Sequence, residues 1–326
     1  MISVSGLSKS FRVAKRASGI GQALKALVVR EYKTVQALNG ITFRIRPGEI
    51  VGYIGPNGAG KSTTIKIMSG ILVPDEGECS IMGYTPWKDR VAYVRHIGVV
   101  FGQRSQLWWD VPVIDSFELL RDIYKVPERA YRDSLDLLVE SLDLRSLVHM
   151  PVRQLSLGQR MRCEIAASLL HGPDILFLDE PTIGLDAVSK IAVRRFIKTI
   201  NEQKGVTVIL TTHDMNDIEA LANRIIMIGN GSLLVDGTLN ELRARFGSRK
   251  TVTVDYRETA DAPLELDGVQ LLSRSATRAV LLVDMERTKI SGVISELSEK
   301  VDIVDVSIEA QPIEDIVVKL YEEYRI

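Results

Sequence analysis

Cysteine is scarce in this sequence, since only two residues of the 326, Cys79 and Cys163, carry a thiol. Their separation matches neither the spacing of a metal site nor that of a redox motif. Two isolated thiols are typical of a protein from a reducing compartment, where disulfides are rare. The sequence therefore excludes a disulfide framework and predicts reduced core thiols in a cytosolic protein.

The chain also lacks an excess of either charge and any long apolar run. Its 41 basic and 42 acidic residues leave a formal net charge of −1, which offers no overall field for nucleic acid. No apolar run approaches the roughly 20 residues of a membrane-spanning helix, and Met1 is not followed by the pattern of a signal peptide. We expect a globular protein with two domains, no nucleic-acid partner and no bilayer crossing by this chain itself.

What the sequence does contain is a phosphate-binding loop pattern. Nine consecutive residues fit the pattern G-x-x-x-x-G-K-[ST], namely Gly55, Pro56, Asn57, Gly58, Ala59, Gly60, Lys61, Ser62 and Thr63. The apolar residues 50–54 predict a buried strand before the loop, and residues 63–69 predict a helix after it. Backbone N–H groups and the helix N-terminus would bind phosphate, while Lys61 reaches the β- and γ-phosphates and Ser62 supplies a hydroxyl to Mg²⁺. A glycine-rich turn without a ligand is the alternative, but this context disfavours it.

A second phosphate-related pattern follows another buried strand. Residues 175–178 form a short continuous apolar run, as in a central parallel strand, and the run ends at Asp179 and Glu180. A carboxylate at the carboxyl end of such a strand, beside a phosphate-binding loop, is placed to hold Mg²⁺. We assign this role to Asp179 and the orientation or deprotonation of water to Glu180. Without the loop at 55–63, a solvated strand end would be the better interpretation of the pair.

A third segment indicates a family. Residues 155–160, Leu-Ser-Leu-Gly-Gln-Arg, precede a helical pattern and resemble the signature sequence of ATP-binding cassette (ABC) ATPases. Further motifs match in family order across residues 1 to about 240: Phe11 the adenine-stacking aromatic, Gln103 the Q-loop glutamine, Gly184, Leu185 and Asp186 the D-loop, and His213 the switch histidine. The resemblance covers about three-quarters of the chain. In isolation, a histidine at a strand end or a glutamine in a polar loop would be an ordinary structural residue.

The resemblance implies an α/β fold of the P-loop NTPase class, with a RecA-like core, an antiparallel β subdomain and a helical subdomain at about 105–155. The nucleotide-binding domain would span 1–245. The resemblance also implies a shared site between two copies of the chain. One copy would hold ATP and Mg²⁺ through Lys61, Ser62, Asp179, Gln103 and His213, with Asp186 nearby, and the other would contribute Ser156, Gly158 and Gln159.

Two departures from the family pattern bear on this site. Leu157 stands where the signature usually has a glycine, but Ser156 and Gly158 are the groups expected to approach the γ-phosphate. Residues 12–33 look like an insertion with six basic residues and a single acid, Glu31, and with apolar residues at helical spacing. The insertion predicts a solvated amphipathic helix or a basic face near anionic lipid or a membrane partner. Because it separates Phe11 from the loop strand, Tyr32 could occupy the adenine face instead.

After Gly247 the pattern changes. Residues 251–256 and 304–308 alternate as strands, and apolar residues recur at helical spacing over 290–297 and 313–320. We expect a small α+β domain over 248–326, which resembles the C-terminal extension of ATPases in the type-2 (ABC-2) exporter group. No residue in it looks catalytic.

The expected function is that of the ATPase subunit of an ABC transporter, which dimerises head to tail around two ATP molecules. It would drive export through separate ABC-2 type permease subunits, as a peripheral protein on the cytoplasmic side of the cell membrane. One alternative is a soluble ABC ATPase with a mechanical role on nucleic acid or the ribosome, although the sequence has neither a second cassette nor a long coiled-coil insertion. A regulatory cassette without turnover is another, which Glu180 and His213 disfavour.

Overall fold

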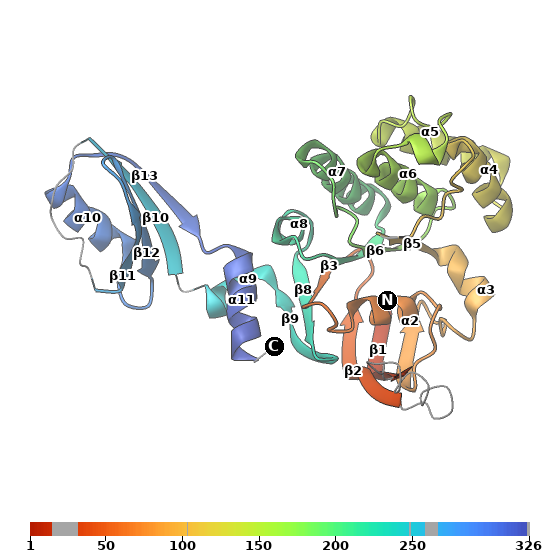
Figure 1. Ribbon diagram of the computed structural model, residues 1–326, viewed down its shortest axis with the longest axis horizontal. Helices are drawn as coiled ribbons and strands as arrows, with labels where there is room; N and C mark the ends of the chain where they lie inside the picture. The colour runs from red at the N-terminus through yellow and green to blue at the C-terminus, as the bar shows by residue number, and fades with distance from the viewer. Residues whose placement is uncertain (15–31, 103, 248, 258–266, 325–326) are drawn as a thin grey trace, which may run out of the picture. The chain divides into compact units, whose positions relative to one another are not determined.

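The computed structural model describes residues 1–14, 32–102, 104–247, 249–257 and 267–324. The chain divides into two compact units, Met1–Asp236 and Gly237–Ile326 (Figure 1). The domain limits inferred from the sequence, 1–245 and 248–326, remain a proposal; helix α9 (Leu239–Phe246) belongs to the second unit here. Within the described ranges, no helix is both long and apolar enough to span a bilayer.

A six-stranded sheet forms the core of the first unit, in the order β5-β6-β7-β3-β8-β9. Its strands are β3 (Ile50–Ile54), β5 (Ile97–Phe101), β6 (Ile175–Asp179), β7 (Thr207–Thr211), β8 (Arg224–Gly229) and β9 (Ser232–Thr238). The strands from β5 through β8 pair in parallel, so their carboxyl ends meet at one edge. Every residue of β3 and β7 is buried, which agrees with their continuous apolar sequences.

A three-stranded antiparallel sheet, in the order β2-β1-β4, completes the strands of this unit. It consists of β1 (Ile2–Ala14), β2 (Tyr32–Ile45) and β4 (Glu76–Ile81). β1 and β2 form a long hairpin that remains paired out to Ala14 and Tyr32. The helix predicted from Ile20, Leu24, Leu27 and Val28 lies outside the described residues, because it falls within 15–31.

Helices cover the parallel sheet. They are α2 (Lys61–Met68), α3 (Arg90–Tyr93), α4 (Val113–Tyr124), α5 (Glu128–Ser141), α6 (Leu157–Leu169), α7 (Ala187–Lys204) and α8 (Met215–Leu221), with short 3-10 turns at Val94–His96 and Val152–Gln154. α4 and α5 pack against α6, which packs on β5. The helical segment expected at 105–155 thus contains α4 and α5. Within this segment, Phe117 of α4 is buried, whereas Ile123 of the same helix is 62% exposed.

The second unit is a four-stranded antiparallel sheet in the order β11-β12-β10-β13, with helices. Its elements after α9 are β10 (Arg249–Tyr256), β11 (Val269–Arg274), β12 (Arg278–Asp284), α10 (Ile290–Lys300), β13 (Ile303–Ala310) and α11 (Ile313–Glu323). Val293 and Leu297 of α10 share a core with alternate residues of β10 and β12, while α11 contacts α9. The predicted α/β class with a small α+β unit is confirmed, although strands β11 and β12 were not predicted.

Candidate active site

The phosphate-binding loop leaves β3 and enters α2 at the carboxyl edge of the parallel sheet. Gly58 and Gly60 have φ angles of +82° and +108°, which disfavour residues with a side chain. A Cβ atom at Gly60 would lie 2.5 Å from the Ala37 carbonyl oxygen. Gly60 is also the N-cap of α2 and provides no side-chain cap. The first-turn N–H groups of α2 therefore form a suitable anion-binding end.

Lys61 lies inside this loop and is only 8% exposed. Its Nζ donates hydrogen bonds to the carbonyl oxygens of Gly55 at 2.6 Å and Pro56 at 3.1 Å. Burial lowers the pKa of the ammonium group, while the negative charges of Glu180 and Asp179 act in the opposite direction. The lysine is thus a cation held at the centre of the loop, within the field of the two carboxylates.

Asp179 ends β6 directly beside the loop. Its Oδ2 accepts a hydrogen bond from Ser62 Oγ at 3.2 Å, and its Oδ1 accepts one from Thr211 Oγ1 at 2.5 Å. Thr211 is the register partner of Asp179 on β7. The sequence interpretation missed Thr211, although a threonine at the end of a strand just before His213 was a signal that could have found it. The hydroxyl of Ser62 and the carboxylate of Asp179 are thus hydrogen-bonded to each other at the loop.

Glu180 follows in a left-handed backbone conformation, with a φ of +55°. This region is costly for a residue with a side chain and recurs at functional sites. The Glu180 N–H donates to the Thr211 carbonyl at 2.9 Å, and the Glu180 carboxylate lies 3.3 Å from His213 Nδ1. The structure therefore brings Glu180 and His213 together beside the Ser62–Asp179 pair.

A cavity of about 350 Å³ opens between these groups. It is lined by Ser62, Lys66, Ile71, Phe101, Gly102, Arg104, Asp179, Glu180 and Ile183. Gly102 is tightly packed, since a Cβ there would lie 2.9 Å from the Asp179 carbonyl oxygen. The predicted Q-loop residue Gln103 lies outside the described residues, while its neighbours Gly102 and Arg104 line the cavity.

The signature residues begin α6, apart from this cavity. Ser156 is the N-cap, its Oγ accepts from the Gln159 N–H at 3.2 Å, and the Gln159 Oε1 accepts from the Ser156 N–H at 2.8 Å. The side chain of Leu157 packs next to Gly184. A Cβ atom added at Gly184 would lie 2.6 Å from Leu157 Cδ2. In the described parts of the chain, no hydrogen bond or ion pair joins Ser156, Gly158 or Gln159 to the phosphate-binding loop. Ser156, Gly158 and Gln159 are also absent from the lining of the cavity beside the loop.

Two other predicted site residues also lie outside the cavity lining. Asp186 caps α7 by accepting from the Ser189 N–H at 2.8 Å, and this hydrogen bond lowers the pKa of the Asp186 carboxyl. Phe11 is 37% exposed on β1, with Lys9 Nζ 5.8 Å from its ring centre. Tyr32, the alternative aromatic, is 55% exposed on β2. Neither aromatic contacts the loop in the described structure.

These features define a P-loop protein with the groups required for nucleotide hydrolysis, and comparison with known proteins identifies its family. The ABC transporter family matches residues 38–183. The daunorubicin resistance ATP-binding protein DrrA3 of Streptomyces coeruleorubidus is 33% identical over 298 residues, which cover 89% of this chain and 93% of that protein. The chain belongs to the ATP-binding proteins of the ABC transporter family.

Other relatives match over less of their length or only in the first unit. The probable multidrug ABC transporter ATP-binding protein YbhF of Escherichia coli strain K12 is 35% identical over 220 residues, or 67% of this chain, and the chain spans only 37% of its length. A dimeric ATP-binding cassette in a post-hydrolysis state with ADP and Pi superposes with a TM-score of 0.61 at 27% identity, covering 73% of this chain and 99% of that one.

Proposed function

We propose that this chain is the ATP-hydrolysing subunit of an ABC exporter, and that two copies close head to tail around two ATP molecules. The observation that carries the proposal is the Glu180–His213 contact of 3.3 Å beside a carboxylate bonded to the phosphate-binding loop. A simple nucleotide-binding loop needs Lys61 and Ser62 but has no use for a carboxylate in a strained conformation next to an imidazole. Hydrolysis requires such a carboxylate, because the attacking water must be oriented and deprotonated.

Mg²⁺ fits the oxygen pair at the loop. The Ser62 hydroxyl and the Asp179 carboxylate lie 3.2 Å apart, and Gln103 would supply a third oxygen. Mg²⁺ takes one or two protein carboxylates and completes its shell with water and phosphate oxygens. When bound, the ion would neutralise charge on the β- and γ-phosphates.

The remaining steps belong to the side chains. Lys61 exchanges its hydrogen bonds to the Gly55 and Pro56 carbonyls for bonds to the β- and γ-phosphates, while the N-terminus of α2 faces the same charge. Glu180 accepts the proton of the attacking water, and His213 holds the carboxylate and the γ-phosphate region in place. The bond between the γ-phosphorus and the bridging oxygen breaks, and the γ-phosphoryl group becomes inorganic phosphate. When this phosphate leaves, the group that joins the two copies is lost, and the pair reopens.

The second copy supplies the signature residues Ser156, Gly158 and Gln159. This assignment is supported by their absence from the lining of the cavity beside the loop and by the dimeric state of the related cassette. Two relatives are named for multidrug transport and daunorubicin resistance, which supports export as the direction. We therefore propose ABC-2 type permease subunits as separate membrane partners, with this chain as a peripheral protein at the cytoplasmic face.

Mixing two inactive variants tests the shared site. Lys61→Ala removes the phosphate ligand, and Ser156→Arg puts a cation at the γ-phosphate position, so each homodimer should lose ATPase activity. In a mixed dimer, one site carries both lesions, whereas the other combines an intact Lys61 with an intact Ser156. We expect ATPase activity to return on mixing, at no more than half the wild-type rate per mixed dimer.

The recovery also controls for folding. Because Ser156 caps α6, its replacement should cost about 1 kcal/mol of stability. A variant that failed to fold could not rescue the other, so recovered activity excludes that explanation. Absence of recovery, with mixed dimers demonstrated by mass spectrometry, would contradict independent head-to-tail sites.

A further inference from the structure

A buried carboxylate outside the family motifs above is hydrogen-bonded to the segments that carry Glu180 and His213. Asp217 of α8 has an exposed fraction of 0%. Its Oδ2 accepts hydrogen bonds from Thr182 Oγ1 and, at 3.1 Å, from Thr212 Oγ1. Its Oδ1 accepts from Arg194 Nε of α7 at 2.6 Å. One carboxylate thus joins the segment after β6, the segment after β7 and the helix α7.

The first of these segments carries Glu180. Its left-handed backbone persists only if the surroundings hold it, because the conformation is unfavourable for a residue with a side chain. On one side, the Glu180 N–H is bonded to the Thr211 carbonyl at 2.9 Å. On the other side, two residues further along, Thr182 is bonded to Asp217. Both ends of the strained turn are therefore anchored by hydrogen bonds.

The second segment carries His213. The His213 side chain is 66% exposed, and the hydrogen bond that the structure gives it is the one to Glu180. Its backbone position is fixed from the preceding residue, since Thr212 Oγ1 donates to Asp217 and accepts from the Asp214 N–H at 3.0 Å. The exposed imidazole is thus positioned by a buried anchor rather than by packing of its own ring.

An ordinary core position does not explain Asp217. A carboxylate in the interior is costly unless it is paired and hydrogen-bonded, and an apolar side chain of similar size would fill the same space. Here the charge is balanced by Arg194, and the other oxygen binds the two threonines that flank Glu180 and His213. The buried carboxylate therefore stands where its hydrogen bonds fix the segments after β6 and β7 relative to each other.

We propose that Asp217 is a positioning residue that sets the distance between Glu180 and His213 through the hydroxyls of Thr182 and Thr212. The proposal rests on the ATP hydrolysis proposed above. A displacement of about 1 Å at a reacting group lowers turnover by as much as about 100-fold. Loss of either hydroxyl should therefore reduce kcat while ATP, held mainly by the loop around Lys61, still binds.

The test replaces each threonine by valine and, as a matched control, by serine. Valine keeps the shape and removes the hydroxyl, whereas serine keeps the hydroxyl and removes a methyl group. For full-length protein with Mg-ATP, we expect kcat to fall roughly 10- to 100-fold in Thr182→Val and Thr212→Val, with KM within about threefold of wild type. Both serine variants should keep most of the wild-type kcat. Valine and serine variants that lose turnover equally would overturn the proposal.

A double-mutant cycle separates the two threonines. In the residual activity of His213→Ala, Thr212→Val should cause little further loss because the residue it positions is gone, whereas Thr182→Val should still act through Glu180. Loss of the same factor from both would indicate general destabilisation and contradict the assignment. A wild-type chain without turnover would instead contradict the proposed hydrolysis.

A readout without turnover is available from the imidazole protons. The chain has four histidines, so the NMR signals of His213 can be assigned by mutation. In the nucleotide-free protein, Thr212→Val should shift the His213 ring signals, while Thr212→Ser leaves them near their wild-type positions. Unchanged His213 signals in Thr212→Val would show that Thr212 does not position this ring.

Discussion

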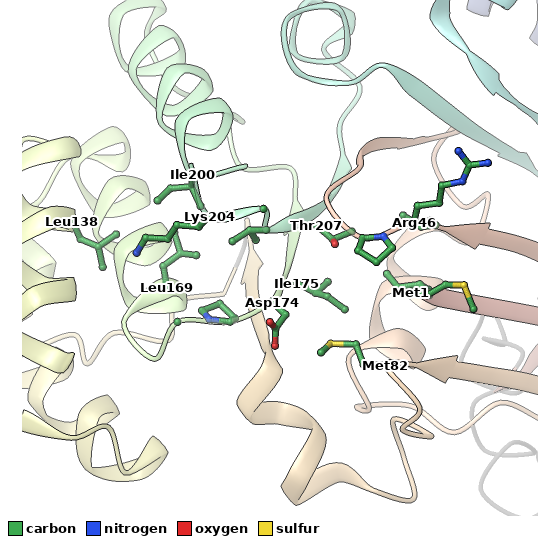
Figure 2. A pocket seen from close by; sticks show the side chains of 17 residues that line it. Met1, Arg46, Met82, Leu138, Leu169, Asp174, Ile175, Ile200, Lys204 and Thr207 are labelled. Atoms are coloured by element: carbon green, nitrogen blue, oxygen red, sulfur yellow. The ribbon is translucent and has the colours of Figure 1, made fainter. Parts of the chain in front are cut away.

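The two ends of the parallel strands differ in how their polar groups are used. At the carboxyl ends, Ser62, Asp179 and Glu180 line one cavity, and the Glu180 carboxylate contacts His213. At the amino ends of β6 and β7 there is another cavity, of about 260 Å³ (Figure 2). Its walls carry both aliphatic and polar residues, and the cations Arg46 and Lys204 lie on opposite sides of it in Figure 2. A cavity with polar residues in its lining exists at each end, so the two ends differ in the contacts that their polar groups make.

Two of the polar groups at the amino ends have structural partners. Asp174 accepts from His96 Nδ1 at 2.8 Å, and Thr207 Oγ1 accepts from the Gly48 N–H at 2.9 Å. At the carboxyl ends, Glu180 is instead held in an unfavourable backbone conformation with its carboxylate against an exposed imidazole. A functional site is therefore recognised by polar groups in contact on a strained backbone, because cavity volume alone does not identify one.

The largest expected effect tests the carboxyl-end site at Glu180. Glu180→Gln keeps the shape of the side chain but removes the base, so turnover should fall by about 10²- to 10⁴-fold. Lys61 and Asp179 are unchanged, so ATP should bind nearly as in the wild type and an ATP-bound dimer should accumulate. Steady-state ATPase assays and size-exclusion chromatography with Mg-ATP measure both effects. Turnover at the wild-type rate would remove Glu180 from the mechanism.

A pair of glycines sharpens the comparison of the two ends. Gly60 at the carboxyl end and Gly205 at the amino end both have positive φ, but only a Cβ at Gly60 meets neighbouring atoms. Gly60→Ala should therefore displace the loop and lower ATP affinity more than tenfold, because backbone and Leu38 atoms lie within 2.7 Å of the new carbon. Gly205→Ala should cost about 1 kcal/mol of unfolding free energy and leave ATP affinity unchanged.

Calorimetric ATP titration and thermal unfolding of both variants check this prediction. Equal losses of ATP affinity in the two variants would mean that destabilising either end of the sheet weakens ATP binding. A normal affinity in Gly60→Ala would mean that the loop tolerates a side chain where the structure leaves no room.

Most of the carboxyl-end site could be predicted from the sequence because its motifs are local. The loop at 55–63 and the strand ending at Asp179 each identify themselves within nine residues, and the structure brings Lys61 and Glu180 to the same edge. Thr211 and Asp217 could not be found in this way. Thr211 meets Asp179 through the parallel register of β6 and β7, and Asp217 meets Thr182 across 35 residues. Such pairings depend on tertiary structure.

In the second unit, the sequence pattern predicts some strands and misses others. β10 alternates buried and half-buried residues and was predicted, whereas β11 has almost every residue exposed and gives no period-two signal. β12 has apolar residues on both faces over Ala279–Val283, so its sequence does not distinguish a strand from a buried helix. The start of α2 at Lys61, two residues before the predicted start, follows from Gly60 as N-cap.

Another test asks how far the carboxyl-end site extends onto the β1–β2 hairpin. Phe11 pairs with Val35 and Tyr32 pairs with Ala14 in a regular antiparallel register. Tyr32 is therefore three positions, about 10 Å, further along the hairpin than Phe11 and on its opposite face, because successive side chains alternate. Only one of the two aromatics can stack on a given adenine, which makes Tyr32→Ala a matched control for Phe11→Ala.

Phe11→Ala should weaken ATP binding by about 1–3 kcal/mol, the scale of one base–aromatic stack, with little change in kcat at saturating ATP. Tyr32→Ala should leave the affinity within the error of a calorimetric titration, because its ring faces away from the side that Phe11 presents. The comparison is best made with GTP as a second ligand, since stacking tolerates either base and both should weaken together in Phe11→Ala. If the loss of affinity occurs in Tyr32→Ala and not in Phe11→Ala, the nucleotide base lies against the face of the hairpin that carries Tyr32. The assignment of Phe11 as the stacking aromatic would then be wrong.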